Sequence, residues 1–88
     1  MKKKILIYEY FTGGGLINED LNSELFPEAI KMLNYLVNEY KKSENFDIKY
    51  FVDIRLKGND KDSIAIKHHD ELYDNKILKK FDLILPIL

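Results

Sequence analysis

Residues 5–15 of the chain read ILIYEYFTGGG, an apolar run that leads directly into three consecutive glycines. The aliphatic and aromatic side chains from Ile5 to Tyr8, bounded by lysines and by the glycines, are typical of a strand buried on both faces, as in a parallel sheet. Three successive glycines permit positive φ angles and the close approach of other atoms to the backbone. This stretch therefore predicts a buried strand that ends in a glycine-rich loop.

The segments that follow alternate between helical and extended patterns. Apolar residues recur at spacings of three and four from Phe26 to Tyr40, which predicts an amphipathic helix, and Pro27 fits its first turn. Four further segments are predicted: a strand near the sheet edge over residues 46–52, a short strand over 63–66, a short helix over 71–80, and an almost wholly apolar, buried strand over 81–88.

This order of elements predicts one domain over residues 1–88, with an α/β fold. The βαβ order is that of a Rossmann-like, open and mainly parallel sheet of about four strands with flanking helices. Strand 5–9 is expected at its centre, with helix 26–40 across one face. The last strand exposes too much apolar surface for a finished soluble protein. We therefore expect a fragment of a longer polypeptide, or a homo-oligomer that buries this strand.

Composition excludes several classes of function. Fourteen basic residues against fifteen acidic ones give a net charge of −1, so no nucleic-acid partner is expected. The absence of cysteine excludes disulfides, thiolate metal sites and thiol nucleophiles. No apolar stretch is long enough to span a membrane, and residues 5–7 are too few for a signal-peptide core. A cytoplasmic location is expected.

The candidate binding residues follow the first and second strands. The backbone amides of Gly13, Gly14 and Gly15 suit an anion or a carboxylate, although a tight turn without a ligand explains the same glycines. The loop is no P-loop, because no Lys-Ser or Lys-Thr follows at the required spacing.

Four further polar residues belong to this candidate site: Glu9, Thr12, Asp53 and Arg55. If the sheet is parallel, Asp53 and Arg55 reach the same carboxyl edge as the loop, where ligands of open sheets bind. Arg55 can hold a carboxylate or phosphate bidentately, or form an ion pair that closes a loop. Glu9, near Thr12, can bind a substrate amine or hydroxyl, or satisfy the loop amides. No catalytic residue is predicted, and no metal site, because adjacent histidines such as His68 and His69 point to opposite faces of a strand.

The motif around the glycines resembles a known family. The stretch Glu9-Tyr10-Phe11-Thr12-Gly13-Gly14-Gly15 is similar to the first loop of the N-terminal, pre-ATP-grasp domain of ATP-grasp ligases of the tyramine–L-glutamate ligase type, which act in methanofuran biosynthesis. Three further stretches match in order, at residues 27–33, 52–56 and 81–86. The chain departs from the family at Ala29, where a glycine is usual. It also lacks the family's Ala-Pro-Glu segment, because Leu85 precedes Pro86 and Ile87 follows it.

The resemblance implies a ligase that joins a carboxylate to an amine through an acyl phosphate. ATP and Mg²⁺ would be bound by a later ATP-grasp domain of the same polypeptide, which would be the partner of this chain. The loop residues, with Glu9, Thr12, Asp53 and Arg55, would then line the substrate side of the cleft. The isolated chain would bind neither cofactor and would be inactive. The competing interpretation is a freestanding α/β module that binds a partner protein or a small ligand without catalysis.

Overall fold

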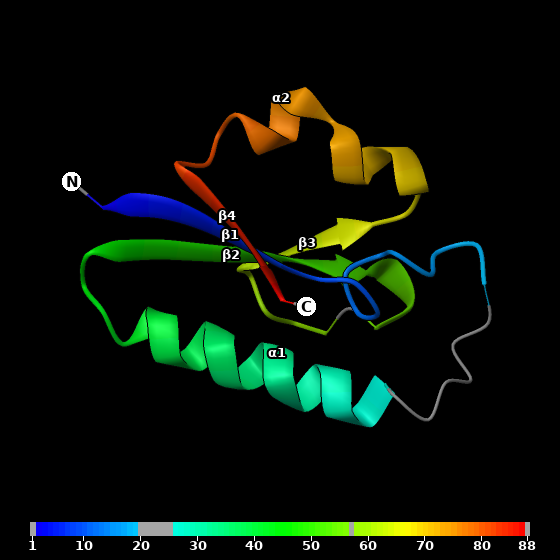
Figure 1. Cartoon of the computed structure of the whole chain (residues 1–88), viewed down its shortest axis with the longest axis horizontal. Helices are drawn as coiled ribbons and strands as arrows, with labels where there is room; N and C mark the ends of the chain where they lie inside the picture. Colours follow the sequence, from blue (N-terminus) through cyan, green and yellow to red (C-terminus); the bar gives the residue numbers. More distant parts are fainter. Residues whose placement is uncertain (1, 20–25, 57, 88) are drawn as a thin grey trace.

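The apolar run at the start of the chain forms the inner part of a four-stranded parallel sheet. Strand β1 (Lys3–Glu9) pairs with β2 (Phe46–Asp53) on one side and with β4 (Leu83–Ile87) on the other, and β3 (Ser63–Ile66) lies outside β2. This computed structural model describes residues 2–19, 26–56 and 58–87 (Figure 1). The predicted α/β class, the parallel pairing and the central position of β1 are confirmed.

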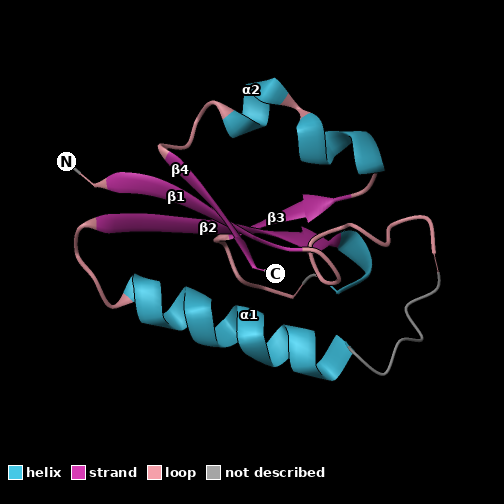
Figure 2. Cartoon of the chain, in the orientation of Figure 1, coloured by secondary structure: helices cyan, strands magenta, loops and turns pink. Residues whose placement is uncertain are grey.

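Different helices cover the two faces of the sheet (Figure 2). Helix α1 (Phe26–Lys41) lies across one face, mainly over β2 and β1. The 3₁₀ helix η2 (His69–Tyr73) and the short helix α2 (Asn75–Leu78) lie on the other face. A second 3₁₀ helix, η1 (Ile54–Leu56), directly follows β2.

Each face has its own apolar core, as the alternation of side chains along a strand requires. On the α1 face, Leu33 and Val37 pack against alternate residues of the strands, including Ile5 and Ile7. On the opposite face, Leu6 packs with a second group of buried residues: Phe51, Ile66 and Leu72. Of the remaining helix residues predicted to be apolar and inward, Ala29 is buried, Ile30, Leu36 and Tyr40 are half-buried, and the side chain of Phe26 lies outside the described part.

The predicted helix over residues 71–80 is wrong in its extent. The chain forms two separate helical turns there, because Asp74 takes an extended conformation with φ −74° and ψ 108°. Its carboxylate accepts a hydrogen bond from Lys76 N at 2.9 Å and so caps α2. Leu72 is buried beneath this segment, and Ile77 and Leu78 pack partly against the same core.

The positions predicted for two strands in the sheet are reversed. Strand β2 is an inner strand, and its polar residues Asp47 and Lys49 lie on a stretch of its face that α2 leaves open. Strand β4 was expected to be buried but forms an edge, where Leu83 is 53% exposed and Ile84 41% exposed. The reason is that α1 packs mainly over β2 and β1, so the apolar side chains of β4 gain little cover. Leu88, also assigned to this strand, lies outside the described residues.

The register determines which backbone groups of β4 face outward. Lys3 N donates to Asn45 O at 2.9 Å, so odd-numbered residues of β1 direct their backbone groups toward β2 and even-numbered ones toward β4. Leu6 is the partner of Ile84, and in a parallel ladder a residue bonds to the two neighbours of its partner. The odd-numbered residues of β4 therefore bond to β1. Pro86, which has no N–H, faces the open edge, as prolines of edge strands do.

A polar network holds the short connection between β2 and β3. Lys41, at the end of α1, and Lys49 of β2 both lie 2.9 Å from the Asp62 carboxylate. Tyr50 Oη donates to the Asp60 carboxylate at 2.6 Å, and Asp60 also accepts from Asp62 N at 2.9 Å. The two aspartates thereby join the carboxyl end of α1 to the start of β3.

Acidification is expected to weaken this network through Asp62. Hydrogen bonds from Lys41 and then from Lys49 lower the pKa of Asp62 from the ordinary 3.8 to about 2. Since the folded pKa lies below the unfolded one, the stabilisation is complete above about pH 4 and is lost as the pH falls toward 2. Because the two lysines are partly solvated, we expect it to amount to about 1–2 kcal/mol.

Urea titrations of the wild type and of Asp62→Asn between pH 2 and 7 measure this contribution. The wild type is expected to be more stable at neutral pH, and the difference should shrink toward zero near pH 2. A difference in free energy of unfolding that is independent of pH would contradict the role of the Asp62 charge.

Candidate functional site

Glu9 and Thr12 form the buried base of the glycine-rich loop. The Glu9 carboxylate is at the carboxyl end of β1, and its Oε1 accepts from Thr12 N at 2.7 Å and from Thr12 Oγ1 at 2.8 Å. Both residues are almost inaccessible, with 5% and 1% of their surface exposed. Of the two roles left open for Glu9, the geometry shows the structural one, because its carboxylate caps the turn that it begins.

Each glycine of the loop is in contact with a different neighbour. A Cβ atom on Gly13 would lie 2.5 Å from Glu9 O, and one on Gly15 would lie 2.5 Å from the ring of Tyr10. Gly14 has φ +99°, and a Cβ there would lie 2.5 Å from Ile66 Cγ2 of β3. The triple glycine is therefore required by packing of the loop on its own chain, whether or not a ligand approaches it.

Hydrogen bonds within the loop also occupy amides that were candidates for an anion. Gly13 N donates to Glu9 O at 2.8 Å, and Gly15 N donates to Tyr10 O at 3.0 Å. These bonds wind the backbone into successive turns after β1. An anion at this loop would have to compete with the loop's own carbonyl groups for these two donors.

Asp53 and Arg55 hold the second half of the same loop in place through hydrogen bonds. The Asp53 side chain is fully buried, and its two oxygens accept from Arg55 Nε at 3.0 Å and from a terminal guanidinium nitrogen at 2.7 Å. The guanidinium also donates to Leu16 O at 2.7 Å and Glu19 O at 2.6 Å. Burial opposes ionisation of Asp53, but hydrogen bonds and the charge of Arg55 outweigh it and lower the pKa of this carboxyl group.

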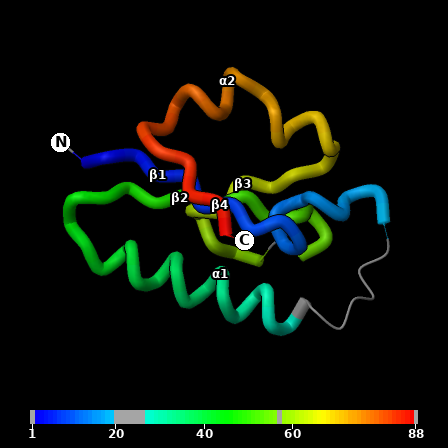
Figure 3. Tube along the Cα trace, viewed as in Figure 1, coloured from blue at the N-terminus to red at the C-terminus, as the bar shows by residue number. Residues whose placement is uncertain are grey.

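The candidate residues thus belong to one connected network at the carboxyl edge of the sheet. Thr12 O accepts from Asp53 N at 2.7 Å, which links the Glu9–Thr12 pair to the Asp53–Arg55 pair. The loop after β1 runs beside the end of β2 and η1, as the trace shows (Figure 3). The prediction that β1 and β2 bring these residues together is correct, and what joins them is direct hydrogen bonding rather than a shared cavity.

Replacing Thr12 by valine is expected to lower the free energy of unfolding by about 1–3 kcal/mol, because a hydrogen bond to a buried carboxylate is lost without a change in side-chain volume. Thr12→Ser, which keeps the hydroxyl group and loses a methyl group, serves as the control. Urea denaturation should rank the serine variant closer to the wild type than the valine variant. The opposite order would show that packing, and not the bond to Glu9, is what Thr12 contributes.

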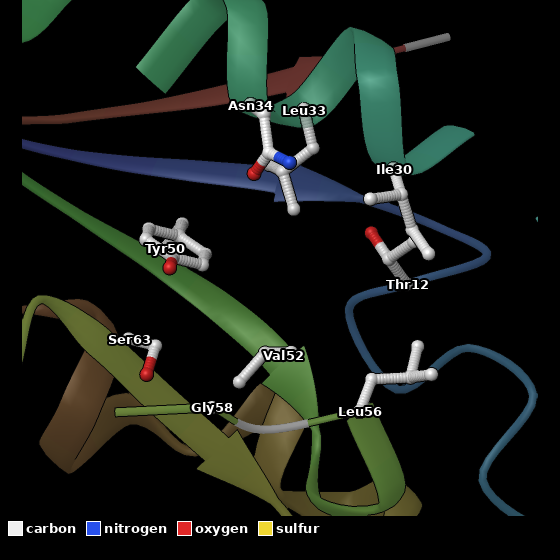
Figure 4. Close-up of a pocket in the computed structure, with 9 residues that line it drawn as sticks. All are labelled: Thr12, Ile30, Leu33, Asn34, Tyr50, Val52, Leu56, Gly58 and Ser63. Carbon is white, nitrogen blue, oxygen red and sulfur yellow. The ribbon is translucent and has the colours of Figure 1, made fainter. Parts of the chain in front are cut away.

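A pocket of about 200 Å³ lies next to this network, between α1, the second half of β2 and the start of β3 (Figure 4). Thr12 alone among the predicted site residues lines it, and its hydroxyl group is bonded to Glu9. Ile30 and Asn34 of α1 extend toward the pocket from one side, and Tyr50 from the other (Figure 4). The remaining described lining residues are Leu33, Val52, Leu56, Gly58 and Ser63.

The described lining of this pocket offers hydroxyl and amide groups but no charged side chain. Its described lining includes no carboxylate, imidazole or amine. The Tyr50 hydroxyl group is committed to Asp60, and burial is the main reason that the pKa of Tyr50 is raised. Sequence reasoning missed this pocket because Ile30 and Asn34 are ordinary members of an amphipathic helix. Gly58 and Ser63 of the lining flank Asp60 and Asp62, and this Asp-x-Asp pair marks the turn before β3 in the sequence.

The two histidines, His68 and His69, lie at the start of η2, shortly after the end of β3. The Glu71 carboxylate accepts from His68 N and Lys67 N, both at 2.8 Å, and the His69 ring lies 5.7 Å from the ring of Tyr73. Among the described residues no group of three potential metal ligands occurs. No helix in the described ranges is long and apolar enough to cross a membrane.

Comparison of the chain with protein-family models, with curated proteins and with solved structures finds no match.

Proposed function

We propose that the chain is the substrate-side domain of an ATP-dependent carboxylate–amine ligase of the ATP-grasp type. The observation that carries the proposal is the placement of the glycine-rich loop at the point where the strand order reverses. The sheet has the order β3-β2-β1-β4, so the chain moves outward from β1 to β3 and returns to the far side of β1. In open α/β sheets, ligands bind at the carboxyl ends of the strands beside this reversal.

The residues at this edge suit the wall of a substrate cleft. The loop is fixed from beneath by Glu9 and from the side by Arg55, which favours a rigid surface. Tyr10, which is 46% exposed, presents an aromatic ring there. Aromatic faces bind apolar groups and cationic amines. The edge would thus orient an amine substrate, as the resemblance of residues 9–15 to the ATP-grasp ligases implies.

The reaction itself would take place on a separate ATP-grasp domain that binds ATP and Mg²⁺. A carboxylate oxygen of the acid substrate would attack the γ-phosphorus of ATP, giving an acyl phosphate and ADP. The amine nitrogen would then attack the acyl carbon, forming the amide and releasing phosphate. In this scheme the present chain positions a substrate and excludes water, and it supplies no group that is phosphorylated.

A partly apolar cavity on the exposed flank of the sheet supports the proposal that another domain packs there. A cavity of about 490 Å³ opens beside β4 and is lined by Ile5, Tyr40, Phe46 and Leu83, with Lys3 and Asp82. Apolar surface of this kind is typical of a face that packs against another domain or subunit. The ATP-grasp domain of the same polypeptide is the neighbour that the proposal requires, and self-association through β4 is the alternative.

The proposal is tested by reading the gene beyond codon 88 and assaying its full product. We expect an ATP-grasp domain downstream, and ADP release that requires both a carboxylic acid and an amine. Hydroxylamine in place of the amine should give a hydroxamate by trapping the acyl phosphate. The 88 residues alone should release no ADP. A stop codon at this point, or ADP release that is independent of both substrates, would contradict the proposal.

A second candidate function is a module that binds without taking part in catalysis. It is favoured by the closed hydrogen bonding at the carboxyl edge, where Glu9 and Arg55 already bond to the loop. If the edge binds substrate, substitutions at the exposed Tyr10 in the full-length protein should raise the KM for the amine. Unchanged kinetics in a stable Tyr10→Ala variant would favour the module.

A further inference from the structure

A second, positively charged pocket lies toward the amino ends of the strands. It has a volume of about 260 Å³ and is lined by four lysines together with Asp47, Ile64 and Phe81. The four lysines come from separate parts of the chain: Lys4 of β1, Lys49 of β2, Lys61 before β3 and Lys80 before β4. The parallel sheet gathers these residues because all of its strands begin at this side.

The charges in this pocket are unbalanced. Lys49 forms an ion pair with Asp62, with 2.9 Å between Nζ and Oδ1. Among the described residues, no ion pair involves Lys4, Lys61 or Lys80. Asp47 is the single acidic residue in the described lining, and the Asp82 carboxylate accepts from Lys4 N at 2.7 Å beside it, so the four lysines still outnumber the three carboxylates around them, with Asp62 included. Like charges held in one concavity repel each other and raise the local concentration of anions.

The remaining lining gives the pocket an apolar side. Ile64 and Phe81 are half-buried and pack against the core that contains Leu6 and Phe51. Their positions are therefore set by the fold, whereas the lysine ammonium groups can adjust to a ligand. A molecule that suits this lining has a small planar or apolar body and a group with two negative charges. A phosphate ester fits, because its oxygens accept from several lysines at once.

We propose that this pocket binds a small phosphomonoester, with the phosphate among Lys4, Lys61 and Lys80 and the organic group against Phe81. The site is separate from the carboxyl edge discussed above and does not depend on the ligase proposal. Its volume accommodates a phosphate with a single ring rather than a whole nucleotide, since sites for drug-sized ligands begin at about 300 Å³.

The test is a titration of the chain with phenyl phosphate and with inorganic phosphate, followed by NMR of the backbone amides. Saturable shifts are expected at Ile64 and Phe81, with tighter binding of phenyl phosphate. The double variant Lys61→Gln/Lys80→Gln should weaken the binding of both probes by about tenfold or more, because two charge-assisted contacts are lost. Phe81→Leu should remove the preference for phenyl phosphate and leave the binding of inorganic phosphate unchanged.

A control variant separates this site from a general effect of charge. Lys31→Gln/Lys67→Gln removes the same charge from exposed positions that lie outside the pocket lining. It should bind both probes as the wild type does. Equal weakening by the two double variants would overturn the proposal, and so would shifts that do not saturate at millimolar concentrations or that occur at the carboxyl edge instead. Melting curves of every variant establish that it remains folded during the titration.

Discussion

Gly14→Val is expected to lower the free energy of unfolding by about 2–4 kcal/mol. A positive φ of +99° is unfavourable for a β-branched residue and accounts for about 1–2 kcal/mol. The new side chain would also overlap Ile66, whose Cγ2 lies 2.5 Å from the position of the added Cβ. Overpacking of this kind adds about 1–3 kcal/mol, and Ile66 is fully buried and has little room to move.

Gly58→Val is the matched control for this prediction, because a Cβ at Gly58 meets nothing within 4 Å. It should change stability by less than about 0.5 kcal/mol. Both variants are compared with the wild type by urea denaturation. If Gly14→Val were as stable as Gly58→Val, close packing on β3 would not explain the glycine. Exposure of the loop to a bound ligand would then become the better explanation.

Asp53→Ala is expected to destabilise the fold by about 2–4 kcal/mol. The substitution removes a fully buried carboxylate that accepts from Arg55 N at 2.9 Å and from two guanidinium nitrogens. Breaking a buried ion pair by removing one partner is strongly destabilising, although partial exposure of Arg55 moderates the loss. The segment that Arg55 holds, including Leu16 and Glu19, should then exchange its amide hydrogens faster.

Glu39→Ala provides the comparison, because it removes an exposed carboxylate that pairs with Lys42 at 3.0 Å. Its effect should stay below about 0.5 kcal/mol. Arg55→Lys keeps the positive charge and loses the bidentate fork, so it should fall between the two variants. Equal stability of Asp53→Ala and Glu39→Ala would mean that the Asp53–Arg55 pair contributes no more than a surface pair.

The sequence predicts the order and direction of the strands well because these depend on local signals. The apolar run of β1 and the periodicity of α1 are both properties of a few neighbouring residues, and the βαβ order then favours parallel pairing. The environment of a strand depends on what lies over it. Thus β2 alternates in polarity although it is an inner strand, and β4 is apolar although it is an edge.

The candidate site was predictable in its location and not in its bonding. Residues at the ends of neighbouring parallel strands meet at one edge, which is why Glu9, Asp53 and Arg55 were correctly grouped. The partners of Arg55 include the carbonyl groups of Leu16 and Glu19, and a backbone carbonyl leaves no signature in the sequence. The close contact between Gly14 and Ile66 likewise joins residues far apart in the chain and depends on how the loop packs against the end of β3.

The outward-facing Pro86 has a consequence for the solubility of the chain. Apart from Pro86, residues 83–87 have the apolar composition of segments that stack into fibrils, and their side chains are partly exposed. Growth of a cross-β stack requires each added strand to find donors and acceptors along the whole exposed edge. Pro86 offers no donor there, so an incoming strand would leave one of its own carbonyl groups unpaired. The proline therefore acts as a gatekeeper against fibril growth and leaves the apolar side chains of β4 available for contact with a folded partner.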